Sequence, residues 1–567
     1  MYVRATPRRN KDGSTVRYLQ LAHNVWDPVA RRSRAQVIYN FGREDAASRA
    51  AIERLVASLS RFLAPESVLA ASAGEGFSFL ESRGLGGSYA LDGLWRRLGI
   101  DALLRRLLAG RRLDAAAERV LFALIANRAL APSSKLAASR WVAEDVHIAG
   151  LPATSDDACY RAMDWLLEIA PALEKEVFHQ VADLLNLEVD LLFFDTTSTY
   201  FCCDEADEPL ARNERGLPLG EDGDGARRAG FRSYGHSKDH RDDLPQVVVG
   251  MAVTREGIPV RVWSWPGNTA DTTLIRQVKE ELRSWTLGRI VWVADRGFAS
   301  AENRRVLRRG DAHYIIAEKL RGGSGEAQAA LARAGRYQEV AGGLRIKEVR
   351  LGGGDRFVLC HNPEAAERDA AVRGRLLARL AEMIAGSDAL SPTKRAELRG
   401  AISTKPGLAR LLRTTAGGLL RIDEAAIKAE ERLDGRYLLR CSDPALSATE
   451  IALGYKQLWQ IERGWRDLKQ VVDLRPVYHR KEERIRAHVL LCWLALLLIR
   501  VAENSCGEGW TNLRRELQKI TLGNFAGPAG SFRQRTEITS SQHAILAKLK
   551  LAEPPRIQEL TPAAPTS

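Results

Sequence analysis

The sequence lacks the features that mark secreted, membrane-spanning and nucleotide-driven proteins. Its seven cysteines include no CxxC pair, and only Cys202 and Cys203 adjoin, so neither a disulfide framework nor a zinc cluster is indicated. No GxxxxGK(S/T) phosphate-binding loop occurs, which argues against ATP-driven chemistry. The N-terminus has no apolar signal core, and the longest apolar run, Val489 to Ile499, is far shorter than the roughly 20 residues that span a bilayer. We therefore expect a cytoplasmic protein with no membrane partner and no nucleotide cofactor, and a buried helix at that run.

Basic residues outnumber acidic ones, 84 to 71, which gives a net charge of +13 and a pI near 9.5. This balance favours a polyanionic partner, for which nucleic acid is a better candidate than an anionic membrane surface. A basic protein with no such partner is the remaining alternative. The 567 residues are too many for one hydrophobic core, so the chain should divide into several domains.

Two short apolar runs each end in an aspartate. Leu191 to Phe194 precedes Asp195, and Ile290 to Ala294 precedes Asp295. Continuous apolar runs of this length are typical of central strands buried on both faces of a sheet. Between them, residues 246–263 predict a hairpin of two further strands. Taken singly, each aspartate has a simpler explanation as a turn or cap residue.

A helix follows the hairpin, with Asp271 as its expected N-cap, and a further strand runs from His313 to Ala317. The sequence of elements is strand with aspartate, hairpin, helix, strand with aspartate, helix, strand. This is the ribonuclease-H-like order, and it lacks only a closing acidic helix. We therefore predict an α/β fold with a ribonuclease-H-like mixed sheet.

Residues 455–469 supply the missing helix. Tyr455, Glu462 and Lys469 are spaced seven residues apart, so they fall on one helical stripe, which Arg466 joins. A carboxylate flanked by cations suits a site where an acid holds a metal and the cations hold phosphate. The simpler alternative is a solvated helix face with intrahelical ion pairs.

Three acids on three separate elements meet the needs of phosphodiester chemistry. Cleavage by two metal ions requires a few carboxylates that converge on one point. Asp195, Asp295 and Glu462 would do so if the sheet brings the first two strands side by side. One ion would activate water or a 3' hydroxyl, and the other would stabilise the leaving oxygen.

The rest of the chain is expected to surround this catalytic core. A basic N-terminal segment alternates apolar and polar residues, which predicts a small antiparallel sheet that could lie along a phosphate backbone, with a solvated strand face as the alternative. We expect a basic sheet and helix at 1–65, a helical DNA-binding region at 66–187, the catalytic domain at 188–320 and 454–505, a strand-containing insertion domain at 321–453, and a C-terminal region at 506–567 that is disordered beyond Glu553.

The sequence resembles insertion-sequence transposases of the DDE type, in the group marked by a YREK signature. That signature is Tyr, two residues, Arg, three residues, Glu, six residues, Lys, and Tyr455, Glu462 and Lys469 match it. Leu458 stands where the signature has Arg, and Arg466 is our candidate to replace it. The stretches FDTTS (194–198), GHSKDHRDDLPQ (235–246) and ADRGF (294–298) also look like motifs of this family.

The resemblance implies a function and its cofactors. Members bind the terminal inverted repeats of their element, cut there and join the freed 3' hydroxyl to target DNA. It implies two Mg²⁺ ions, with Mn²⁺ as a substitute, held by Asp195, Asp295 and Glu462. It also implies DNA phosphate contacts from Tyr455 and Lys469, double-stranded DNA as the partner, and a homodimer in the end complex. A structure-directed nuclease on the same fold and a catalytically silent DNA-binding regulator are the alternatives.

Two other features carry less weight. The loop that contains His236, Asp239 and Asp242 has residue types that bind metals, but a solvated loop explains it better because cations interleave with them. A buried strand before Asp195 could also open a dehalogenase-like phosphatase. That fold needs a second aspartate two residues on, where Thr197 stands.

Overall fold

The structure of the protein is a computed structural model, and it describes residues 2–28, 31–60, 78–109, 116–185, 190–203, 205–213, 217–219, 227–285, 289–352, 354–527 and 530–562. Two compact units are present. The larger consists of Arg83–Leu522 and Arg535–Pro555, and the smaller consists of Met1–Ser82, Gly523–Gln534 and Arg556–Ser567.

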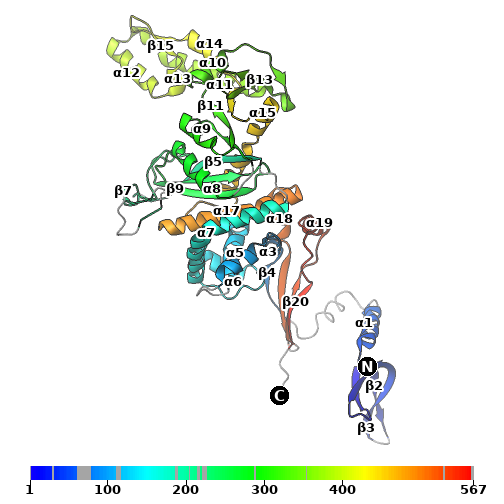
Figure 1. Cartoon of the computed structure of the whole chain (residues 1–567). Helices are drawn as coiled ribbons and strands as arrows, with labels where there is room; N and C mark the ends of the chain where they lie inside the picture. Colours follow the sequence, from blue (N-terminus) through cyan, green and yellow to red (C-terminus); the bar gives the residue numbers. More distant parts are fainter. Residues whose placement is uncertain are drawn as a thin grey trace. The chain divides into compact units, whose positions relative to one another are not determined.

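A nine-stranded mixed sheet is the centre of the larger unit (Figure 1). Its strand order is β12-β13-β14-β17-β11-β10-β5-β8-β9. The strands are β5 (Leu191–Tyr200), β8 (Gln246–Val253), β9 (Pro259–Pro266), β10 (Val291–Ala294), β11 (His313–Glu318), β12 (Gln338–Glu339), β13 (Arg345–Arg350), β14 (Arg356–His361) and β17 (Arg436–Cys441). The five strands from β9 to β11 have the ribonuclease-H-like arrangement, since β5, β10 and β11 are parallel and β8 is antiparallel to both of its neighbours, β5 and β9. The predicted mixed sheet is therefore confirmed.

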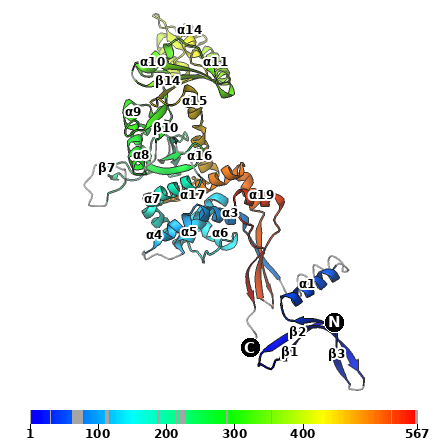
Figure 2. The same ribbon diagram turned by 45° about the vertical axis from the view of Figure 1, so that its right-hand side comes forward.

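The two faces of this sheet contribute side chains to two separate hydrophobic cores. Side chains of a strand alternate between faces, so Leu191 and Phe193 enter one core while Leu192 and Phe194 enter the other. The helices that cover the second face are α8 (Leu274–Arg283) and α9 (Ala301–Leu307). The first face packs against α15 (Ala448–Lys456), α16 (Trp459–Gln470) and α17 (Glu482–Cys506), as Figure 1 and Figure 2 show. Burial on both faces explains why the strands read as continuous apolar runs.

Helix α17 connects the sheet to the helical region. It packs against α5 (Ala117–Leu130) and α7 (Asp156–Leu185), beside α3 (Gly86–Arg97), α4 (Ile100–Leu108) and α6 (Lys135–Glu144). It is the one helix among the described residues that is long and apolar enough to cross a membrane, with a mean hydropathy of 1.9. Because 94% of the most apolar 18-residue stretch of α17 is buried within the structure, α17 is a core helix. The predicted buried helix at Val489 to Ile499 is confirmed and extends further at both ends.

Within residues 321–453, the strands β12, β13, β14 and β17 extend the mixed sheet. β17 pairs antiparallel with β11 on one side and with β14 on the other. These pairs satisfy the backbone groups of β11, which would otherwise form an open edge. Helix α10 (Gly325–Ala332) covers these strands, and a further small core lies among α11 (Pro363–Ile384), α12 (Pro392–Ser403), α13 (Pro406–Ala409), α14 (Glu424–Glu431) and the hairpin of β15 (Leu412–Thr414) and β16 (Leu420–Ile422).

The smaller unit contains the predicted basic sheet. β1 (Tyr2–Arg9), β2 (Thr15–Asp27) and β3 (Arg32–Arg43) are antiparallel neighbours, and α1 (Ala46–Ser60) follows them. A four-stranded sheet has the order β20-β19-β18-β4, from β4 (Ser78–Gly84), β18 (Thr521–Gly527), β19 (Gly530–Arg535) and β20 (Ile557–Pro562).

The expectation of disorder beyond Glu553 is wrong for the residues that the structure describes there. β20 pairs with β19, so backbone hydrogen bonds hold a segment whose proline and alanine content suggested disorder. The residues after Pro562 lie outside the described part of the chain.

We expect the free energy of unfolding to fall on acidification, because two buried imidazoles stay neutral in the folded chain. Burial lowers the pKa of His479 to about 4 and the pKa of His488 well below its ordinary value of 6.5, and the nearby Lys135 and Arg128 lower both further. The unfolded chain therefore binds protons that the folded chain does not. This stabilisation is complete above about pH 6.5 and is lost as the pH falls towards about 4.

Urea midpoints at about pH 7.5 and about pH 5 test this expectation. His479→Gln should make the loss of stability between the two pH values smaller than in the wild type. His236→Gln, at a side chain that is 91% exposed, should leave the wild-type pH dependence intact. An equal pH dependence in all three proteins would contradict the account.

Candidate active site

The register of two parallel strands brings Asp195 and Asp295 together. β5 pairs with β10 from Leu191↔Val291 to Phe194↔Ala294, so the next residue on each strand is an aspartate. β10 ends there, whereas β5 continues to Tyr200 and pairs with β8 alone. Asp195 thus lies inside its strand and not at the strand's exit as the sequence predicts, at the point where the sheet opens between β5 and β10.

A third carboxylate, that of Asp271, acts on Asp195 of this pair. Burial raises the pKa of Asp195 to about 6, and the Lys238 ammonium acts against this rise. The negative charges of Asp295 and Asp271 raise the pKa of Asp195 further. Asp295 and Asp271 are therefore both close enough to Asp195 for their charges to act on it.

The closing acidic helix is present but is broken. α15 ends at Lys456 and α16 begins at Trp459, with a tight turn in which the Leu458 N–H donates to the Tyr455 carbonyl at 2.9 Å. The expected single helix from Tyr455 to Lys469 is therefore wrong. Leu458 is 9% exposed and packs in the core, which explains why an apolar residue stands where the signature has Arg.

Tyr455 lies in the field of all three predicted acids. Burial raises its pKa, and the negative charges of Asp295, Glu462 and Asp195 add to that rise. Its ring lies 5.8 Å from that of Tyr437. The Glu462 side chain is exposed, on the helix that packs against β5 and β8. The structure thus brings the acids to one region. Among the described residues, however, no group of three His, Cys, Asp or Glu side chains is close enough to form a ready metal site.

Lys238 and Asp271 also belong to this region, and sequence reasoning missed both. Asp271 makes no helix-capping hydrogen bond. Its carboxylate accepts a hydrogen bond from Thr196 Oγ1 at 2.6 Å and pairs with Lys238 Nζ at 3.1 Å. The expected cap is therefore wrong. Lys238 lies in the GHSKDHRDDLPQ stretch, and the likeness of that stretch to a family motif was the available signal.

Asp239 of the same loop holds two cations, Lys469 of α16 and Arg475 beyond it. Asp239 accepts from Lys469 Nζ at 2.9 Å and pairs with an Arg475 guanidinium nitrogen at 3.0 Å. Arg475 lies over the ring of Tyr200, the last residue of β5, at 4.7 Å from its centroid. Burial lowers the pKa of Lys469, while Asp239 acts against this change. Arg466 is exposed on α16, one turn beyond Glu462.

The loop itself divides into two parts. His236 and Asp242 have side chains that are 91% and 66% exposed, as expected of a solvated loop. Asp239 and Lys238 turn inwards, with side chains 17% and 32% exposed. Only the inward pair contacts the residues of the candidate site.

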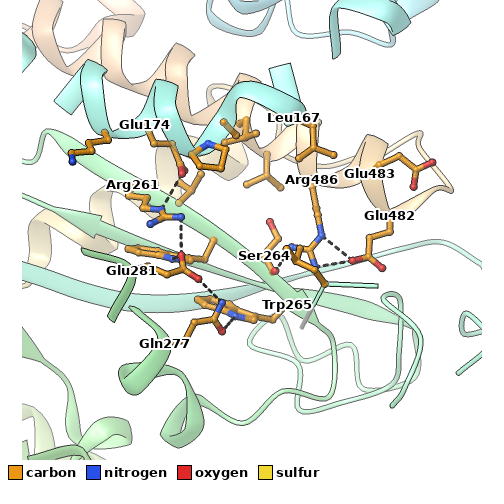
Figure 3. A pocket seen from close by; sticks show the side chains of 18 of the residues that line it. Leu167, Glu174, Arg261, Ser264, Trp265, Gln277, Glu281, Glu482, Glu483 and Arg486 are labelled. Carbon is orange, nitrogen blue, oxygen red and sulfur yellow. Dashed lines mark hydrogen bonds and ion pairs between the residues drawn. The ribbon is translucent and has the colours of Figure 1, made fainter. Parts of the chain in front are cut away.

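A cavity of about 660 Å³ lies elsewhere, along the edge strand β9 (Figure 3). It lies between α7, α8 and α17, and an Arg261 guanidinium links Glu174 and Glu281 within it at 2.9 and 2.7 Å. Trp265 lines it as well. None of the three predicted acids lines this cavity, so its size does not make it the site of the chemistry.

We expect Asp239→Ala to destabilise the larger unit by about 1–3 kcal/mol, because it leaves Lys469 and Arg475 half-buried without their shared carboxylate. The matched control is Asp243→Ala, which removes an exposed partner of Arg241 and should destabilise the protein less than Asp239→Ala does. Urea unfolding of both variants measures the difference. Equal losses would show that the inward ion pairs do not hold this region together.

Among curated proteins, none matches the chain. A solved structure described as a piggyBac transposase synaptic complex with hairpin DNA matches 76% of this chain and 77% of its own, at 12% identity and a TM-score of 0.33. At that score, the likeness carries no argument about the fold.

Two family models match the sequence itself. The transposase DDE domain matches residues 222–498, a segment that contains Asp295 and Glu462 but begins after Asp195. The N-terminal domain of IS1634 family transposases matches residues 3–70. The two matches lie in the expected order along the chain and cover both the basic N-terminal sheet and most of the large mixed sheet. The chain therefore belongs to the insertion-sequence DDE transposases, enzymes that cleave DNA and transfer its strands.

Proposed function

We propose that Asp195, Asp295 and Glu462 are the catalytic carboxylates of this transposase. The observation that carries the proposal is the β5–β10 register, which makes the first two acids neighbours at the mouth of the sheet. The position of Tyr455 in the field of Asp295, Glu462 and Asp195 supports the third member. The substrates would be the terminal inverted repeats of the element and a target duplex.

These acids fit a hard divalent cation, and we propose Mg²⁺, with Mn²⁺ as a substitute. Carboxylate oxygens are the donors that Mg²⁺ prefers. Asp195 and Asp295 repel each other at the end of a buried strand pair, and a cation between them would relieve that repulsion. Glu462 would complete the set by turning its exposed side chain towards them. When bound, the two metal ions supply an activated nucleophile and stabilise the leaving oxygen.

Phosphate contacts would come from the end of α15 and from α16, the helix that carries Glu462. We propose Tyr455, Arg466 and Lys469 for this role. Leu458 is packed in the core, so it offers no contact in place of the signature Arg. Arg466 supports the replacement, because it is exposed one turn from Glu462. Lys469 would reach phosphate while Asp239 holds it in place.

The N-terminal regions would bind DNA, and the insertion would cover the site. The basic sheet of residues 1–65 and the helical region of residues 66–187 are the proposed DNA-binding segments, and the insertion of residues 321–453 would lie over the site from the β17 side of the sheet. The acting form would be a homodimer on paired double-stranded ends in a bacterial-type cytoplasm. Neither a membrane nor a nucleotide cofactor enters the proposal.

Cleavage and joining of a labelled duplex that carries the element's own end tests the catalytic residues. With Mg²⁺, Asp195→Ala, Asp295→Ala and Glu462→Gln should each lose about a thousandfold or more in rate while still binding the end, because the three act as one unit. Removal of the metal with a chelator should abolish wild-type activity. A variant with full activity would remove that residue from the site.

The products separate the proposal from its alternatives. A transposase joins the cut end to target DNA, whereas a nuclease leaves it free and a silent regulator binds without cutting. Conversion of a pre-cut end into a joined product by the wild type, and not by Glu462→Gln, is the expected result.

Arg466→Ala should weaken binding of the end by about tenfold, since it removes one charge-assisted phosphate contact. The binding should also depend less steeply on salt, with a slope lower by about one. Arg432→Ala, at an exposed arginine just after α14, is the control and should bind like the wild type. Undiminished binding by Arg466→Ala would show that Arg466 does not replace the missing Arg.

A further inference from the structure

The ammonium of Lys238 is surrounded by oxygens at the first catalytic aspartate. Lys238 Nζ donates to the Thr196 carbonyl at 2.8 Å and to Thr196 Oγ1 at 2.5 Å. It lies 3.1 Å from Asp271 Oδ2 and 3.8 Å from Asp195 Oδ1. Two carboxylates, a carbonyl and a hydroxyl are the donors with which proteins bind hard cations.

The surroundings hold this ammonium from several sides. The Lys238 backbone N–H donates to Ser198 Oγ at 2.8 Å, which fixes the loop to β5. The next residue, Asp239, is paired with Lys469 and Arg475. Thr196 Oγ1 donates to Asp271, so the carboxylate that anchors the ammonium is itself oriented by β5. A lysine on a flexible surface loop would have none of these restraints.

Asp271 and Asp295 also approach each other around Gly297. A Cβ added at Gly297 would lie 2.9 Å from Asp295 Oδ1 and 3.9 Å from Asp271 Oδ2. The Gly297 N–H donates to Asp295 Oδ1 at 2.7 Å. Asp195, Asp271 and Asp295 thus share one small region, and a divalent cation placed there could be drawn to the wrong pair of acids.

We propose that Lys238 is a positioning residue, a built-in cation that occupies an oxygen cage formed by Asp271, Thr196 and one oxygen of Asp195. The ammonium neutralises Asp271 and lies near Oδ1 of Asp195. The other carboxylate oxygen of Asp195 is then left to act with Asp295. This inference rests on the proposed function, since it takes Asp195 and Asp295 as catalytic. Asp271 is the anchor of the ammonium and does not touch the reacting atoms.

Binding of Mn²⁺ to the DNA-free protein tests the cage directly. Isothermal titration of Lys238→Ala should show one more Mn²⁺ per chain than the wild type, because the emptied cage keeps its four oxygens. Lys238→Arg should retain the wild-type number, since it keeps a cation in the cage. Lys394→Ala, at an exposed lysine of α12, is the control and should bind like the wild type. Equal numbers in Lys238→Ala and the wild type would overturn the proposal.

Strand cleavage at saturating Mg²⁺ tests the positioning role. Lys238→Met, which keeps the apolar stem, should lower kcat at least tenfold with unchanged affinity for the end, and Lys238→Arg should recover part of the loss. Undiminished kcat in Lys238→Met would overturn the role, and so would weakened end binding, which would make Lys238 a phosphate contact. Asp195→Ala and Asp295→Ala separate the two proposals. If they stay active, the catalytic assignment fails. If they are inert while Lys238→Met is not, only the role of Lys238 fails.

Discussion

The pairing of β5 with β10 is the constraint on which the rest of the site depends. Parallel strands in this register place Asp195 and Asp295 side by side, and no local sequence signal connects two residues so far apart. The pairing holds because both strands are buried between two cores, one beneath α15, α16 and α17 and the other beneath α8 and α9. A shift of register would separate the acids and also turn apolar side chains to the wrong core.

Acidic and basic side chains surround this pair of aspartates in two separate groups. The acids lie at the mouth of the sheet, and cations approach them from one loop and one helix. Lys238 meets the acids, while Asp239 in the same loop holds Lys469 and Arg475. Two adjacent residues therefore connect the acidic and the basic parts of the site. A transposase needs both, because metal ions and phosphates must meet at one place.

The elements could be predicted from sequence where burial imposes a pattern. Apolar runs identified β5, β10 and α17, and heptad spacing found Glu462. The break between α15 and α16, just before Trp459, could not be predicted, because Leu458 continues the helical spacing of the sequence. Its packing in the core is seen only in the fold. The role of Asp271 was missed because an aspartate before a helix is usually a cap, whereas here tertiary contacts to Thr196 and Lys238 compete for its carboxylate. The pairing of β20 was hidden by its composition, because the hydrogen bonds come from distant β19.

The most direct test of the account is the position of the metal in a crystal of the protein with Mn²⁺ and the element's end DNA. Anomalous scattering locates the ion without reference to any assumed ligand. The account predicts an ion bound by both Asp195 and Asp295, with Glu462 turned towards the same centre. An ion bound by Asp271 without Asp295, or one held away from the β5–β10 junction, would contradict it.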